Sequence, residues 1–180
     1  MQAGKAVYVE KPMALHYGEC LDMLRVSHET GMPLYVAYYR RTLPAFLKVK
    51  ELIEAGAIGQ VLTVGIKLFK QSRERHLKPE EMSWHVNPAI AGAGYFYDLA
   101  SHQFDYLDFL FGPVTLIKGL AVNRAGLYAA EDTVSAIFSF ASGVTGCGHW
   151  CFVADKSGEE VDVGDTITYT IAYTNVGTVD

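Results

Sequence analysis

The sequence predicts an α+β fold, and two kinds of hydrophobic spacing carry this prediction. At the start of the chain, two short apolar segments flank a stretch with helical spacing, which is typical of a βαβ unit. Further along, several segments alternate apolar and polar residues at period two, as strands of a half-exposed sheet do. We therefore expect an α/β unit at the start, followed by a mostly antiparallel open sheet.

The expected βαβ unit spans residues 6–39. Residues 6–9 and 34–39 have the composition of strands, and the apolar residues between them recur at helical spacing until Gly31 ends the helix. Two strands joined by such a crossover should run parallel. A parallel pair needs further strands beside it, and the chain begins only five residues before its first strand. We therefore expect strands of this unit to precede Met1.

The remaining elements follow in chain order. Apolar spacing predicts a helix over residues 46–55, and then a strand whose even-numbered residues from 62 to 68 share the buried face. After a long polar loop, a helix is expected from about Asp98 to Phe111, where a Gly-Pro pair ends it. The strands expected after this helix are residues 114–122, 132–141 and 144–153.

Charge and composition exclude several classes of protein. The 180 residues hold 15 Lys and Arg against 20 Asp and Glu, a net charge of −5, which argues against a nucleic-acid binder. Residues 133–154 lack charged side chains, yet their glycines and alternation favour two strands over a membrane helix. The N-terminus lacks the apolar core of a signal peptide, and the three cysteines form no C-x-x-C pair. We therefore expect a cytoplasmic protein that binds neither nucleic acid nor membrane.

The C-terminal segment differs in composition from the rest of the chain. Residues 161–180 contain five Thr and no Lys, Arg, Trp or Cys, and they alternate as a strand does. This composition resembles the threonine-rich repeat strands of bacterial surface proteins, which would make the segment a foreign tail. An ordinary further strand of the sheet is the alternative.

A first group of candidate residues follows the two strands of the βαβ unit. Glu10, Lys11 and Pro12 come directly after the first strand, and Tyr39 follows the second together with Arg40 and its neighbouring arginine. The carboxyl ends of parallel strands meet at one edge of a sheet, where open α/β sheets hold their ligands. We expect these side chains to converge on one crevice, and a solvated turn is the alternative for so short a motif.

The second candidate is the pair Asp98 and His102. Their i, i+4 spacing places both side chains on one face of a helix. A carboxylate beside an imidazole orients the ring and supports its protonated form, which suits a general base near neutral pH. Two alternatives stay open: Asp98 as the N-cap of the helix, and His102 as a satisfied core histidine.

Two further patterns are weaker. Cys147, His149 and Cys151 share one face of a strand, where they are too far apart to converge on a tetrahedral metal, so we expect buried packing residues and no metal site. Gly92 and Gly94 precede a helix without following a strand, so they are not a phosphate loop, and the sequence holds no G-x-G-x-x-G.

Four segments agree in order and spacing with one enzyme family. They are residues 4–12 (GKAVYVEKP), 38–41 (YYRR), 51–59 (ELIEAGAIG) and 92–102 (GAGYFYDLASH). In these segments the chain resembles the glucose-fructose oxidoreductase, inositol dehydrogenase and MocA family of NAD(P)-dependent enzymes, from about Gly4 to Glu160. The resemblance implies that residues 1–41 are the last βαβ unit of a Rossmann domain. Residues 42–160 would then be an incomplete substrate and oligomerisation domain.

The resemblance also implies roles for the candidate residues. His102 would take the hydroxyl proton as hydride leaves the carbon, Lys11 would bind that oxygen, and Asp98 would orient His102 or bind a neighbouring hydroxyl. The residues that would hold NAD or NADP are Glu10, Lys11, Pro12 and Arg40. Those that would contact the substrate, a sugar, cyclitol or related diol, are Tyr39, Trp84 and Asp98.

We therefore expect a fragment of an NAD(P)-dependent oxidoreductase that transfers hydride between nicotinamide and a secondary alcohol. Without a glycine-rich cofactor loop, this chain alone is expected to be inactive. The alternative is a non-catalytic binding module derived from the substrate domain, and titration with the cofactor distinguishes the two. The apolar face of the open sheet leads us to expect a homo-oligomer.

Overall fold

The computed structural model describes residues 1–72, 78–154 and 169–174. Strands β1 (Val7–Val9) and β2 (Leu34–Val36) form a two-stranded parallel sheet, joined by α1 (Tyr17–Thr30). The predicted parallel pairing is therefore confirmed. The second strand is shorter than predicted, because Tyr39 begins a 3₁₀ turn, η1 (Tyr39–Thr42), instead of ending the strand.

A five-stranded mixed sheet forms the second part of the fold. Its spatial order is β4-β5-β6-β3-β7. The strands are β3 (Gln60–Gln71), β4 (Val114–Val122), β5 (Thr133–Phe140), β6 (Thr145–Ala154) and β7 (Tyr169–Thr174). The pairs β4–β5 and β5–β6 are antiparallel, as expected, whereas β3 runs parallel to β6 and antiparallel to β7. In Tyr169–Thr174 the C-terminal segment is thus a further strand of the sheet, which was the alternative to a foreign tail. The rest of the segment 161–180 lies outside the described residues.

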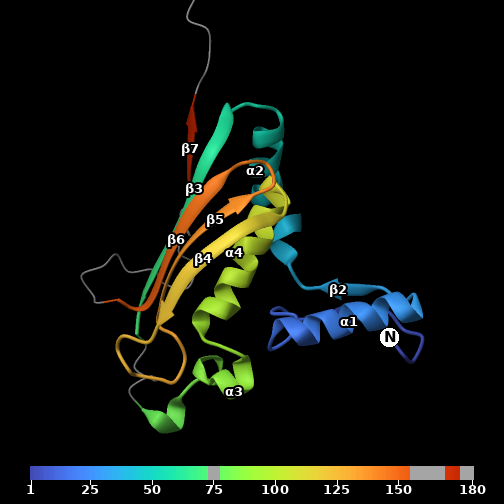
Figure 1. Ribbon diagram of the computed structural model, residues 1–180, viewed down its shortest axis with the longest axis vertical. Coiled ribbons are helices and arrows are strands. Elements are labelled where there is room, and N and C mark those ends of the chain that lie inside the picture. Colours follow the sequence, from blue (N-terminus) through green and yellow to red (C-terminus); the bar gives the residue numbers. More distant parts are fainter. Residues whose placement is uncertain (73–77, 155–168, 175–180) are drawn as a thin grey trace, which may run out of the picture.

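The helices of this second part are α2 (Pro44–Glu54), η3 (Pro79–Glu81), η4 (Trp84–Val86), α3 (Pro88–Ala91) and α4 (Tyr95–Phe111). Of these, α2 and α4 lie on one side of the sheet (Figure 1). Figure 1 shows α4 between the sheet and the βαβ unit. No helix in the described ranges is long and apolar enough to cross a membrane.

One stripe of α4 packs on the sheet. Its members recur at helical spacing and are Phe96, Ala100, Gln103, Leu107 and Phe111. The ring of Phe96 lies 4.9 Å from that of Trp150, which is completely buried on β6. Glycine is required next to this indole, because a Cβ at Gly148 would overlap it. Small residues on β6 therefore make room for the large side chain that joins sheet and helix.

The register of β3 departs from the predicted one at its start. Val64, Ile66 and Leu68 lie on the buried face as expected, but Leu62 is 45% exposed and Val61 is buried in its place. The pairing of β3 with β7 is irregular between Val61 and Thr63. An irregularity of this kind shifts the alternation by one residue, which explains the exchange.

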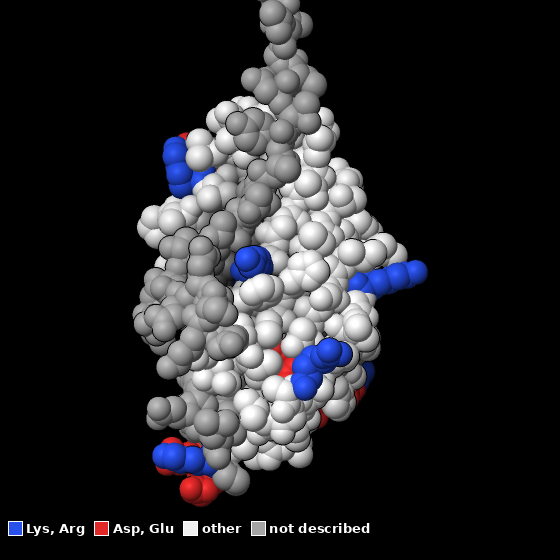
Figure 2. Space-filling view, turned by 90° about the vertical axis from the view of Figure 1, so that its left-hand side faces the viewer, with Lys and Arg blue, Asp and Glu red and all other residues white. Residues whose placement is uncertain are grey.

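The opposite face of the five-stranded sheet is open. Leu120 and Ile137 are 65% and 56% exposed there, and Figure 2 shows few charged side chains outside its grey atoms. Cys147 and His149 are also exposed on β6, because the even-numbered residues of this strand take the core side. The expectation of buried packing residues is therefore wrong for these two positions. No group of three possible metal ligands occurs in the described part of the chain.

A buried hydrogen bond links helix and sheet. Trp150 Nε1 donates to Gln103 Oε1 over 2.6 Å, and both side chains are inaccessible to solvent. Replacing Gln103 by Leu should lower the free energy of unfolding by about 1–3 kcal/mol, because the buried indole N–H loses its acceptor. Urea unfolding of the chain measures this change.

A double-mutant cycle separates the bond from the packing. The combination of Gln103→Leu with Trp150→Phe should cost less than the sum of the single changes, because the second change removes the donor that the first left unpaired. Costs that add within about 0.5 kcal/mol would contradict a coupled pair.

Candidate active site

A second stripe of α4 faces the βαβ unit and the segment that follows β2. Asp98, His102, Asp105 and Phe109 recur at helical spacing along it. Each of the four contacts a residue between Lys11 and Lys50, as described below. The candidate site therefore lies where the first part of the chain meets α4.

The first contact is an ion pair between Lys11 and Asp98. Lys11 follows β1, and its Nζ donates to Asp98 Oδ1 over 2.5 Å and to the main-chain oxygen of Asp98 over 3.3 Å. The two side chains are only 18% and 25% exposed. Nearby, Tyr97 Oη donates to the main-chain oxygen of Ala14 over 2.7 Å. The loop after β1 is thus fixed to the first turn of α4, and the two predicted groups come together.

Two glycines allow this close approach. Gly92 has a φ of +83°, and a Cβ on it would lie 2.5 Å from the main-chain oxygen of Leu15. A Cβ on Gly94 would lie 2.8 Å from the main-chain oxygen of Glu131, whose carboxylate accepts from Gly94 N over 2.9 Å. The Gly-Ala-Gly segment therefore packs between the loop after β1 and the loop before β5.

The position of Asp98 excludes one alternative. Helix α4 begins at Tyr95 with Gly94 as its N-cap, so Asp98 lies in the first turn and the N-cap interpretation is wrong. Its side chain points to Lys11, and Ser101 Oγ donates to its main-chain oxygen over 3.0 Å. Asp98 is thus free of a capping role and is available to the site.

His102 lies one turn further along and is 3% exposed. The rings of Tyr38 and Tyr39 meet it edge-on, with centroids 5.9 and 5.2 Å from the imidazole. Its Nδ1 is buried and has no hydrogen-bond partner in the described structure. Buried polar atoms normally have partners. His102 therefore differs from a satisfied core histidine, because its Nδ1 has no hydrogen-bond partner among the described residues.

The surroundings of His102 keep the ring neutral. Burial is the main cause that lowers its pKa to about 4, and the positive charges of Arg40 and Lys11 act in the same direction. The carboxylate of Asp98 raises the pKa but does not outweigh them. Asp98 therefore supports the protonated form, as its spacing predicts, but burial and the two cations keep the neutral ring the favoured form. At neutral pH the imidazole is free to accept a proton.

The other residues of the first group lie at different depths. Arg40 is half-buried, and its charge acts on His102, so it lies near the imidazole. Pro12 is half-buried, whereas Glu10 and Tyr39 are exposed. Arg41 was expected in the same crevice, but its guanidinium points to Asp105, with Nε 2.8 Å from Oδ2. Sequence reasoning missed Asp105, although it continues the spacing of Asp98 and His102.

Trp84 lies beside the first turn of α4. Its indole is 56% exposed and stacks on His85 with centroids 3.8 Å apart. The ring of His85 lies 6.1 Å from that of Tyr95, which starts the turn that carries Asp98. The stacked rings therefore fix the orientation of the Trp84 indole, whose other face is exposed.

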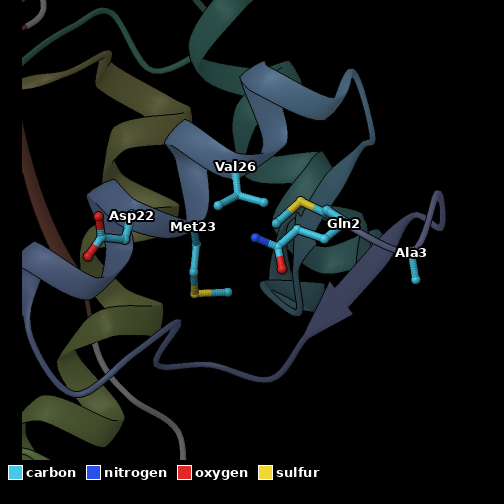
Figure 3. A pocket seen from close by; sticks show the side chains of 6 residues that line it. Gln2, Ala3, Asp22, Met23 and Val26 are labelled. Carbon is cyan, nitrogen blue, oxygen red and sulfur yellow. The ribbon is translucent and has the colours of Figure 1, made fainter.

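A separate hollow of about 480 Å³ lies between the N-terminal residues and α1 (Figure 3). Its lining residues are Met1, Gln2, Ala3, Asp22, Met23 and Val26. None of them is a candidate catalytic residue. The stripe of α4 that carries Asp98 and His102 therefore remains the candidate active site.

Comparison with known proteins gives one family. Residues 46–175 match the model of the GFO/IDH/MocA C-terminal domain. Oxidoreductase P35 of Formosa agariphila is 35% identical over 164 residues, which cover 91% of this chain and 50% of the relative. Inositol 2-dehydrogenase of Rhizobium meliloti is 33% identical over 147 residues, which cover 79% of this chain and 42% of the relative.

The chain is also similar to a solved dehydrogenase structure. The crystal structure of the WlbA dehydrogenase from Bordetella pertussis, in complex with NADH and UDP-GlcNAcA, matches with a TM-score of 0.73 and 30% identity. The match covers 86% of this chain and 44% of the WlbA chain. This chain spans about half the length of the proteins it matches.

The packing of Gly92 can be tested with a matched glycine. Gly92 and Gly126 both have positive φ, but a Cβ on Gly126 meets nothing within 4 Å. Alanine at a left-handed position costs about 1–2 kcal/mol for the backbone alone. Gly92, with φ 83° and ψ −34°, lies outside that region, so its backbone adds strain of its own. Gly92→Ala should lower the melting temperature clearly more than Gly126→Ala, because it also collides with Leu15. Equal decreases in circular-dichroism melts would show that the loop after β1 does not pack against Gly92.

Proposed function

Because the chain belongs to the GFO/IDH/MocA family, we propose that it takes part in NAD(P)-dependent hydride transfer to or from a secondary alcohol of a sugar, cyclitol or related diol. The observation that carries the proposal is the ion pair of Lys11 and Asp98, one turn from the buried His102. An inositol 2-dehydrogenase and a dehydrogenase bound to NADH and a sugar nucleotide are among the similar proteins, which supports the substrate class.

Residues 1–41 are, in this proposal, a piece of a dinucleotide-binding domain, and residues 42–160 belong to a substrate domain. The cofactor would lie at the carboxyl edge of β1 and β2, where parallel strands hold such ligands. The residues that would hold it there are Glu10, Lys11, Pro12 and Arg40. Lys11 and Arg40 follow the two strands at this edge, and both charges act on the nearby His102. When bound, the nicotinamide supplies or accepts the hydride.

The side chains of this chain handle the proton. The neutral His102 accepts the hydroxyl proton as the alcohol is oxidised, and returns it in the reverse direction. Lys11 directs two hydrogen bonds to Asp98, which leaves its third N–H for the reacting oxygen. Asp98 orients Lys11, and its negative charge stabilises the imidazolium that forms.

Three residues would shape the substrate pocket. Tyr39 contacts the imidazole edge-on while half of its surface remains exposed, so it can also reach a bound substrate. The exposed indole of Trp84 offers a flat surface for the apolar face of a sugar ring. Asp98 has a second carboxylate oxygen that can accept a hydrogen bond from a neighbouring hydroxyl.

The proposal also includes self-association through the open face of the five-stranded sheet. Leu116, Leu120 and Ile137 are between 47% and 65% exposed on this face. Exposed apolar surface of this kind favours burial against another protein surface, and a second copy offers the same surface in a two-fold arrangement.

This chain alone is proposed to bind the cofactor weakly. In its 180 residues no glycine-rich turn follows a strand and opens a helix, and that turn is what holds a pyrophosphate. Calorimetric titration of the chain with NADH tests this proposal, and weak binding is the expected result. A micromolar dissociation constant would contradict it, because binding of that strength requires a phosphate site within the chain. A chain that binds sugars but does not take part in catalysis is the alternative function.

The catalytic roles are tested in a fusion that places a nicotinamide-binding domain of this family before Met1. His102→Asn keeps the size and some hydrogen bonding of the side chain but loses its proton uptake, so turnover should fall about 10²- to 10⁴-fold. Asp98→Asn should cause a smaller loss and shift the pH profile, because it removes the charge that supports the imidazolium. The measurement is nicotinamide absorbance with a panel of sugars and cyclitols.

Lys48 provides the matched control for Lys11. It is an exposed lysine that pairs with Glu51 on α2, away from the candidate site. Lys11→Met should abolish most of the turnover, whereas Lys48→Met should leave it unchanged. Equal activity of the His102→Asn variant and its parent per folded molecule would assign His102 to packing and remove it from the mechanism.

Self-association is tested at the centre of the open face. Ile137→Asp places a charge on the apolar surface and should shift the protein from dimer to monomer in sedimentation velocity. Leu47→Asp is the control, because Leu47 is 44% exposed on α2 and not on the sheet. A dimer that survives Ile137→Asp would exclude this face as the interface.

A further inference from the structure

Arg41 clamps the segment after β2 onto α4. Its Nε donates to both carboxylate oxygens of Asp105 over 2.9 and 2.8 Å, and its Nη2 donates to the main-chain oxygen of Asp105 over 3.0 Å. The Asp105 side chain is 9% exposed, and the guanidinium lies 5.3 Å from the centroid of Phe109. Bidentate pairs of this kind fix orientation as well as distance.

The two residues of this clamp, Arg41 and Asp105, both lie close to His102. On α4, Asp105 follows His102 by three residues, so the two side chains are neighbours on one face. In the other segment, Arg41 follows Tyr38 and Tyr39, whose rings meet the imidazole edge-on. The segment that carries these rings is thus attached to the helix through Arg41, and Tyr38 is also hydrogen-bonded to Ser101 of α4.

Other contacts of this segment lie further from the imidazole. Tyr106 Oη donates to the main-chain oxygen of Phe46 over 2.9 Å, and Lys50 Nζ donates to that of Phe109 over 2.8 Å. Both contacts hold α2. They position the helix, whereas Arg41 anchors the turn η1 that carries Tyr39.

We propose that Arg41 and Asp105 are a positioning pair for His102, which holds the Tyr38 and Tyr39 rings against the imidazole and keeps water from it. The catalytic consequence rests on the proposed function, but the packing does not. If the pair is broken, η1 can move away from α4 and solvent reaches the ring.

Removing Asp105 has two effects on the pKa of His102, and they act in opposite directions. The groups whose charges act on His102 are Lys11 and Arg40, which lower its pKa, and Asp98, which raises it. Loss of the negative charge of Asp105 by itself would lower the pKa of His102 further, since it leaves Arg41 uncompensated. Entry of water would raise it, because burial is the main cause of the low value. The direction of the change therefore separates a positioning role from a purely electrostatic one.

The experiment is a pH titration of the His102 ring by NMR in the whole 180-residue chain, with Asp105→Ala. The pKa of His102 should rise from about 4 towards the ordinary 6.5. Asp108→Ala is the matched control, because Asp108 is one turn away, 42% exposed and touches Arg41 only at 3.4 Å. The control should leave the pKa unchanged.

Arg41→Lys tests the same pair with less risk to the fold. It keeps the positive charge but loses the two-pronged geometry, so the pKa of His102 should rise by less than in Asp105→Ala. A pKa that stays near 4 or falls in folded Asp105→Ala or Arg41→Lys protein would overturn the positioning role. The readout needs no cofactor or turnover, so it stands apart from the proposed hydride transfer.

Discussion

Helix α4 is enclosed on two sides, and charged groups on an enclosed helix need partners. One stripe of the helix is apolar apart from Gln103 and packs on the sheet, whereas the other carries Asp98 and Asp105. An unpaired carboxylate in such a place would cost several kcal/mol, about what a broken buried ion pair costs. Lys11 and Arg41 supply the partners, and both come from the first part of the chain. The position of the first part of the chain on the rest of the fold therefore depends in part on the same two ion pairs that border the candidate site.

This arrangement explains why His102 is neutral although acidic residues lie before and after it on its helix face. A carboxylate beside an imidazole normally favours the charged ring. Here the Asp98 carboxylate is compensated by Lys11 and that of Asp105 by Arg41, so neither acts as an isolated negative charge. Arg40 adds a cation, and burial acts in the same direction. The low pKa of His102 is thus a property of the whole set of charges around α4 and not of the Asp98–His102 spacing.

Local spacing was sufficient to predict the parallel pairing of β1 with β2, the helix that ends at Phe111 and the contact between the groups of Lys11 and Asp98, although this helix begins at Tyr95 and not at Asp98. It failed where the outcome depends on residues distant in the sequence. The parallel β3–β6 pair joins strands separated by about half the chain. The exchange of Leu62 for Val61 follows an irregularity in pairing with β7. Arg41 directly follows Arg40 in the sequence. Only the location of Asp105 decides that the Arg41 guanidinium binds α4 and not the same ligand site as Arg40.

The first part of the chain contributes little apolar burial of its own. Helix α1 has no buried residue. Tyr8 and Tyr35 are opposite each other in the paired strands of the small sheet, and they are 68% and 56% exposed. Because the first part makes so little hydrophobic contact, hydrogen bonds and ion pairs determine its position against α4. Hydrogen bonds and ion pairs define distance and angle where apolar contacts do not. A site that moves a proton needs such definition at Lys11 and His102, so the weak packing of this part leaves the polar contacts to set the geometry on which the proposed chemistry depends.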